Sequence, residues 1–162
     1  MNKWFWTVII VLLSTLTHAS GPVLPDRYRL PTTDELKADW RSENANRYAE
    51  FTADLNGDNL VDGCFLAIDK RQNKLVLLAV LCFDDADKWL LLDTMNIDAL
   101  QYMGVEKVEP STVMVYPPKE GNTKTPKQLK NSAIKLFASE GSSSVFYWNG
   151  KAKKFLKLWL TK

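Results

Sequence analysis

Acidic and amide side chains at regular spacing are the clearest chemical feature of this sequence. Residues 54–62 read Asp-Leu-Asn-Gly-Asp-Asn-Leu-Val-Asp, so oxygen-bearing side chains stand at loop positions one, three, five and nine. Ca²⁺ is bound by about six to eight oxygens, and a tight loop with acids or amides at alternate positions turns such oxygens toward one centre. The spacing predicts a calcium site formed by the side chains of Asp54, Asn56, Asp58 and Asp62 and the backbone carbonyl of Leu60.

The loop departs from a full EF-hand loop at two positions. Position twelve is Phe65 instead of a bidentate Glu, so water or a bidentate Asp62 must complete the ligand shell. Position six needs a positive φ and carries Asn59 instead of Gly. With three carboxylates we expect weak binding, with a Kd on the order of 10⁻⁴ to 10⁻³ M. The alternative is an ion-free turn in which Asp and Asn side chains cap the backbone.

The loop is flanked by residues typical of strands. Segments 48–53 and 64–69 are short and rich in apolar and β-forming residues, so the ion would join two strands. In this setting the loop resembles an FG-GAP or VCBS calcium repeat, whose pattern Asp-x-Asn/Asp-x-Asp-Gly-x-x-Asp is matched except at Asn59. One copy is present, and the chain is too short for a propeller of such repeats. The chain is also similar to small exported bacterial proteins with one such loop and a C-terminal Tyr-Trp-Asn/Asp-Gly hairpin.

The N-terminus has the organisation of a secretory signal. Residues 1–19 combine a positive charge at Lys3, an apolar run over 4–13, and Thr17-His18-Ala19 as a small-residue cleavage site. The segment is too short for a stable membrane span, although an uncleaved anchor is the alternative. We therefore expect a periplasmic or secreted protein whose residues 20–162 form one globular domain.

Composition restricts the chemistry further. The single histidine, His18, lies in the predicted signal peptide, so cleavage would remove the imidazole needed for Ser-His-Asp or Cys-His catalysis and for His-ligated zinc. The formal net charge is +2. That balance gives no reason to expect nucleic acid or an anionic membrane as a partner.

Two cysteines lie in a predicted hairpin. Cys64 and Cys82 stand in the apolar runs 64–68 and 75–82, which are joined by a polar stretch. If the turn centres near Asn73, the cysteines face one another, and an oxidising compartment favours a disulfide. Such a bond would contribute about 3 kcal/mol in the chain-entropy model. A register shift would instead leave two free thiols on different faces.

The remaining elements predict an α+β fold, mostly antiparallel β-sheet with one short N-terminal helix. A capping-box pattern over Thr32–Glu35, with Leu36 and Trp40 four residues apart, predicts a helix over 33–43. Segment 117–128 is rich in Pro, Gly, Thr and Lys and is expected to be a long exposed loop. Further strands are predicted at 88–92, 105–108, 112–116, 145–148 and 155–160, with Asn149-Gly150 as the turn between the last two.

Three weaker signals each have an ordinary structural explanation. The aromatic side chains of the last hairpin can either stack on sugar rings or pack within the sheet; they are Tyr147, Trp148, Phe155 and Trp159. Ser132 and Lys135 match a Ser-x-x-Lys nucleophile motif, but its companion motifs are missing. Acids at 84, 85 and 87 suit either a glycoside hydrolase pair or a charged turn.

Export, small size and the lack of catalytic groups predict a non-catalytic binding protein with calcium as a structural ion and a protein partner in the cell envelope. A narrower alternative is a periplasmic inhibitor or immunity protein against a cell-wall hydrolase or secreted toxin. Its contact residues would lie in loop 117–128 or at Glu140, Ser142, Ser143 and Ser144. The contrasting alternative is a carboxylate-based glycoside hydrolase.

Overall fold

The computed structural model describes residues 23–41, 44–84, 86–117 and 123–161. The predicted signal peptide at 1–19 lies outside the described residues. The elements of the described chain are β1 (Tyr28–Arg29), η1 (Asp39–Arg41, a 3-10 helix), β2 (Glu50–Ala53), β3 (Asp62–Asp69), β4 (Lys74–Leu81), β5 (Lys88–Asn96), η2 (Ile97–Gln101, a 3-10 helix), β6 (Met103–Val108), β7 (Thr112–Val115), β8 (Thr125–Gln128), β9 (Ala133–Ala138), β10 (Ser143–Asn149) and β11 (Lys154–Thr161).

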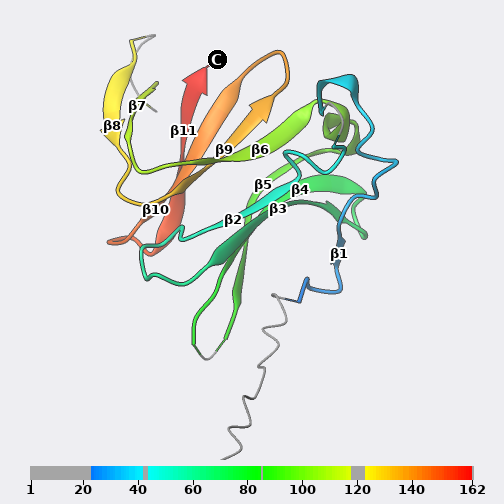
Figure 1. The fold of residues 1–162 in the computed structure, drawn as a ribbon, viewed down its shortest axis with the longest axis horizontal. Coiled ribbons are helices and arrows are strands. Elements are labelled where there is room, and N and C mark those ends of the chain that lie inside the picture. Colours follow the sequence, from blue (N-terminus) through cyan, green and yellow to red (C-terminus); the bar gives the residue numbers. More distant parts are fainter. Residues whose placement is uncertain (1–22, 42–43, 85, 118–122, 162) are drawn as a thin grey trace, which may run out of the picture.

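Two antiparallel sheets pack face to face (Figure 1). The first has the strand order β1-β3-β4-β5, with β2 also paired to β3, and the second has the order β11-β10-β9-β6. A separate ribbon of β7 and β8 lies beside β11. Strands β5 and β11 therefore stand at the ends of their sheets.

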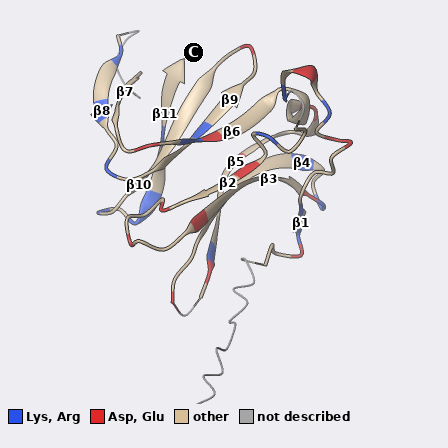
Figure 2. Ribbon diagram, in the orientation of Figure 1, with Lys and Arg blue, Asp and Glu red and all other residues tan. Residues whose placement is uncertain are grey.

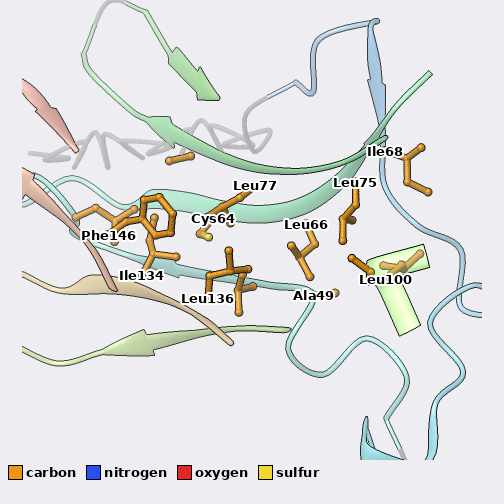
Figure 3. Close-up of a cluster of buried hydrophobic side chains, with 14 of the residues drawn as sticks. Ala49, Cys64, Leu66, Ile68, Leu75, Leu77, Leu100, Ile134, Leu136 and Phe146 are labelled. Atoms are coloured by element: carbon orange, nitrogen blue, oxygen red, sulfur yellow. The ribbon is translucent and has the colours of Figure 1, made fainter. Parts of the chain in front are cut away.

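The main core fills the space between the two sheets (Figure 3). Period-2 alternation sends every second side chain of a strand to the same face. One sheet contributes Cys64, Leu66 and Leu77, and the other contributes Leu136 and Phe146. Burial of this apolar surface is the main force that holds the sheets together.

Both sheets are also covered on their outer faces. Val76 and Leu78 of β4 point away from the main core and pack against Tyr28 and Trp89. On the other sheet, Val145 packs with residues of the β7–β8 ribbon and its flanks. Strands β3 and β4 are thus buried on both faces, which explains why their sequences are continuous apolar runs.

The predicted α+β class is wrong, because the described part of the chain contains only short 3-10 helices beside its antiparallel strands. The capping box does form: the Glu35 N–H donates to Thr32 Oγ1 at 3.3 Å, and the Thr32 N–H donates to Glu35 Oε2 at 2.8 Å. However, Glu35 is also bound by Arg29. Among the described residues of this turn, the only backbone bonds that follow are from Leu36 N–H to the Thr32 carbonyl and from Lys37 N–H to the Asp34 carbonyl. A single turn does not propagate without enough favourable residues and packing after it.

The predicted disulfide is also wrong, and the reason is the position of a turn. Asp69 pairs with Lys74, and Asp69 Oδ1 accepts hydrogen bonds from the next loop amides, so the turn is centred before Asn73. Cys64 therefore lies opposite Ala79. Cys64 faces the main core with Leu81, so Cys82, which follows Leu81, falls on the other face. Both cysteines are free.

The C-terminal hairpin is confirmed, but its turn differs from the prediction. Asn149 pairs with Lys154, so residues 150–153 form the loop, and Lys153 has the positive φ of 50°. Asn149 Oδ1 accepts the Lys151 and Ala152 N–H groups at 3.1 and 3.0 Å. Three strands were not predicted: the short β1, β9, and β8 within the segment expected to be a loop.

A buried arginine joins the N-terminal segment to the second sheet. Arg41 is fully buried. Its Nη1 donates to the Arg47 carbonyl at 2.7 Å, and its Nη2 donates to the carbonyls of Met103 at 2.7 Å and Leu100 at 3.3 Å. The guanidinium also stacks on Trp40, 4.3 Å from the ring centroid. Burial lowers the pKa of Arg41 to about 10, still well above neutral pH.

We expect Arg41→Ala to lower the free energy of unfolding by about 3 kcal/mol, because it leaves buried carbonyls without donors and removes the stacking contact. Urea denaturation of the purified protein measures the change. The control is Lys37→Ala, which breaks an exposed ion pair with Asp34 and should cost under about 0.5 kcal/mol. Equal stability of the two variants would contradict this assignment.

Candidate functional site

The 54–62 loop connects β2 to β3 and is closed by the pairing of Ala53 with Asp62. Two of its residues adopt the left-handed conformation, Gly57 with φ of 84° and Asn59 with φ of 69°. The predicted positive φ at Asn59 is therefore confirmed. Asn and Gly are the residues that tolerate this region best, so the local sequence suits the tight loop.

The polar side chains of the loop bind its own backbone. Asp54 Oδ1 accepts the Gly57 N–H at 2.6 Å and Asp54 Oδ2 accepts the Asn59 N–H at 3.0 Å. Asn56 Oδ1 accepts the Asp58 N–H, and Asp58 Oδ1 accepts the Leu60 N–H, both at 2.9 Å. These bonds fix the loop shape. A carboxylate has about four lone-pair sites, so its oxygens retain capacity for an ion.

Asp62 holds the loop in place through hydrogen bonds to its buried carboxylate. The residue is 1% exposed; its Oδ2 accepts the Leu55 N–H at 2.8 Å, and its Oδ1 accepts the Cys82 N–H at 3.0 Å. Burial raises the pKa of Asp62, and these two hydrogen bonds offset part of the rise. No lysine or arginine of the described residues forms an ion pair with it. The carboxylate thus ties the start of the loop to the end of β4.

The structure brings the predicted metal ligands into one loop without gathering them around one point. Asp58 is exposed, Asp54 and Asn56 are half-buried, and Asp62 is buried beneath them. Within the described ranges, no group of three or more acidic, Cys or His side chains is arranged to hold an ion. Calcium at Asp54, Asn56, Asp58, Leu60 and Asp62 therefore stays a prediction.

A cleft opens between the sheets where β5 and β11 face one another. Its volume is about 390 Å³. Met95, Met103 and Leu136 supply apolar lining, while Trp159, 41% exposed, and Tyr102, 48% exposed, line its open side. The exposed rings of Trp159 and Tyr102 thus lie beside a hollow with apolar lining.

An ion pair between two lining residues of this cleft joins β11 to β5. Lys157 Nζ on β11 lies 2.5 Å from Asp93 Oδ2 on β5. Lys157 also lines a second hollow of about 250 Å³, whose apolar residues include Leu90 and Phe155. The two hollows therefore share Lys157 as a lining residue.

The predicted partner-binding residues divide between the cleft and its surroundings. Ser142 and Ser144 line the cleft. Ser143 is 7% exposed and its Oγ lies 3.0 Å from Thr161 Oγ1, so it stabilises the β10–β11 pairing. Glu140 is exposed in the β9–β10 turn and does not line the cleft. That turn is tight, because the Ala138 N–H donates to the Ser142 carbonyl at 3.0 Å.

The predicted catalytic alternatives gain no support from their positions. Lys135 lies on β9 and pairs with Glu106 at 2.6 Å, whereas Ser132 precedes that strand. Asp84 and Asp87 are exposed in the β4–β5 connection, and Asp85 lies outside the described residues. Asp93 is the one carboxylate among the described residues that line the cleft.

The aromatic residues of the last hairpin have mixed roles. Trp148 and Phe155 pack together with ring centroids 5.3 Å apart, against the main core, which is the sheet-packing alternative. Trp159 is exposed at the cleft. Tyr102 and Met95, also in the cleft, were missed by sequence reasoning. No local pattern marks them, because the cleft exists only when β5 and β11 face each other.

Comparisons with protein-family models, curated proteins and solved structures found no match to this chain. The likeness to an FG-GAP or VCBS repeat thus rests on the loop residues alone. In the described part of the chain, no helix has the length and apolar character needed to cross a membrane.

We expect Asp62→Ala to destabilise the fold by about 2 to 4 kcal/mol, because it leaves the buried N–H groups of Leu55 and Cys82 without acceptors. Thermal and urea unfolding measure the change. Asp26→Ala, at an exposed turn, is the control and should stay within about 0.5 kcal/mol of the unmodified protein. If Asp62→Ala lowered the free energy of unfolding as little as Asp26→Ala, the hydrogen bonds of Asp62 would not stabilise the fold.

Proposed function

We propose that this chain is an exported, non-catalytic binding protein of the cell envelope. Its cleft between β5 and β11 takes a segment of a protein partner, and its 54–62 loop takes calcium as a structural ion. The observation that carries the proposal is the exposure of Trp159 and Tyr102 beside an apolar hollow at the end of the sandwich.

The composition of the cleft supports protein binding. Trp and Tyr are the residues that most often dominate binding energy at interfaces, and they do so beside well-packed apolar pockets. Ser142 adds an exposed hydroxyl group that can orient a bound segment. The Asp93–Lys157 pair is partly exposed, so a partner's charged group can exchange for either member at little cost.

The cleft favours binding over catalysis. Acid–base hydrolysis of a glycoside requires two carboxyl groups about 5 to 9.5 Å apart. Asp93 contributes a single carboxylate, and Lys157 already pairs with it. A partner that is a hydrolase or toxin would make this protein an inhibitor or immunity protein, a narrower form of the same proposal.

The calcium part of the proposal is supported by charge. Asp54, Asp58 and Asp62 place three carboxylates in one short loop, with Asp62 buried. A divalent cation would supply the opposite charge that a buried carboxylate without an ionic partner requires. The spare lone pairs of these side chains and the Leu60 carbonyl are oxygen ligands of the kind that Ca²⁺ prefers. The ion would stiffen the β2–β3 connection, which is a structural role.

We expect immobilised protein to retain one stoichiometric protein from an envelope extract of its own cells, and Trp159→Ala to lose it. After purification of that partner, titration calorimetry should give a Kd at least about 30-fold weaker for Trp159→Ala, the usual effect of removing a central aromatic contact.

The matched control is Phe83→Ala, an aromatic residue after β4 that is 42% exposed and lines neither the cleft nor the second hollow. It should change the Kd by less than about threefold, as peripheral contacts do. Equal retention by both variants, or no stoichiometric protein on any column, would refute the cleft as the binding surface.

A further inference from the structure

A separate pocket, distinct from the cleft and from the hollow beside it, lies at the opposite end of β10. Its volume is about 380 Å³, and its walls come from the end of β10, the β10–β11 turn, the end of β8 and the 54–62 loop. The loop and the turn lie side by side in Figure 1. This volume is within the range of small-ligand sites, about 300 to 1,000 Å³.

The charge of the pocket is entirely positive. Lys127, Lys130 and Lys151 line it, and no carboxylate is among the described lining residues. Figure 2 shows the basic residues on β8 and beside the β10–β11 turn. Lys37, Lys107, Lys135 and Lys157 each pair with an acid elsewhere, whereas the described structure gives the three pocket lysines no ion pair. An anionic ligand would therefore not have to break an existing pair.

The pocket also presents uncommitted amide groups. Asn131 forms no hydrogen bond with any described residue, and Asn149 uses its Oδ1 for the turn while its Nδ2 is free. Gln128 and Asn56 are committed to neighbouring groups. A side-chain amide has two donors and an acceptor, which suits the paired hydroxyls of a sugar.

An aromatic ring completes the polar lining. Tyr147 is half-buried in the pocket wall, and Lys127 Nζ lies 4.5 Å from its ring centroid. A tyrosine ring offers a flat apolar surface together with a polar tip. A ligand with C–H groups on one face and oxygens at its rim would match this wall better than a purely apolar ligand or a purely ionic ligand would.

The calcium-type loop fixes one side of the pocket. A Cβ placed on Gly57 would lie 2.8 Å from both terminal atoms of the Asn131 side chain. The backbone of the loop therefore packs directly on this amide and holds it in place. Glycine is required here both for the close approach and for the positive φ of 84°.

We propose that this pocket binds an acidic saccharide of the uronic-acid class. The lysines would take the carboxylate, and the amides of Asn131 and Asn149 would bind hydroxyl groups. The part of the Tyr147 ring that is not covered by Lys127 or by the core would contact the sugar ring. Three lysines around a hollow are too few for the extended basic stripe that tracks a nucleic-acid backbone. This site shares no lining residue with the cleft, so it stands or falls independently of the partner binding proposed above.

The test is an NMR titration of ¹⁵N-labelled protein with trigalacturonate and with a hyaluronan tetrasaccharide, in buffer of physiological salt. We expect at least one probe to shift the backbone amides of Tyr147, Asn149 and Lys151, with a Kd on the order of 1 mM. The methyl ester of that probe, which lacks the charge and keeps the sugar stereochemistry, should bind at least about tenfold more weakly.

Two variants with a matched control locate the site. Lys151→Gln and Asn131→Ala should each weaken binding about fivefold, whereas Lys154→Gln, which removes the same charge from an exposed lysine outside the pocket, should change it less than about twofold. The amide spectrum of each variant shows that it is folded.

Three results would overturn the proposal: no shift with either saccharide at 20 mM (about twentyfold above the expected Kd), equal binding of acid and ester, or equal weakening by Lys151→Gln and Lys154→Gln. Tighter binding of a short oligothymidylate at the same amides would assign the pocket to nucleic acid instead. Loss of cleft binding in Trp159→Ala would leave all of these measurements unchanged.

Discussion

The buried carboxylate of Asp62 is the constraint on which the rest of the structure depends. It accepts the Leu55 N–H at the start of the loop and the Cys82 N–H at the end of β4, so one side chain joins three segments. A buried carboxylate without an ionic partner is costly and is tolerated only when it is well hydrogen-bonded. In the proposed account, calcium in the loop would lower that cost, and the 54–62 loop would hold Asn131 at the edge of the basic pocket.

The two proposed binding surfaces follow from how the sheets end. Packing of two sheets leaves β5 and β11 at the same edge, where side chains do not fill the space completely, and the cleft opens there. The β7–β8 ribbon covers the outer face of the second sheet and brings Lys127 next to Tyr147. The core and the outer layers are thus complete on their own, and the exposed aromatic and basic groups are available for partners.

The sequence allowed a good prediction of whatever depends on local residues. Continuous apolar runs predicted β3 and β4, and the positive φ at Asn59 followed from its place in the loop. The predictions failed where the structure depends on the exact position of a turn or on a contact between residues far apart in the sequence. The turn after Asp69 is centred slightly earlier than expected. Cys64 therefore pairs with Ala79 across the hairpin and does not lie opposite Cys82. The capping box at Thr32 formed a single turn, because the residues after it bury Arg41 in a tertiary contact instead of continuing a helix. The cleft depends on two strands far apart in sequence, so no local pattern predicts it.

The most direct test of this account is a crystal structure of the protein grown with millimolar calcium, with anomalous scattering measured at long wavelength. The account predicts an anomalous peak in the 54–62 loop about 2.3 to 2.6 Å from oxygens of Asp54, Asn56, Asp58 and the Leu60 carbonyl, with Asp62 or water completing the shell. A loop without a peak, in which these oxygens bind only backbone N–H groups, would contradict the calcium site and leave Asp62 as a purely structural anchor.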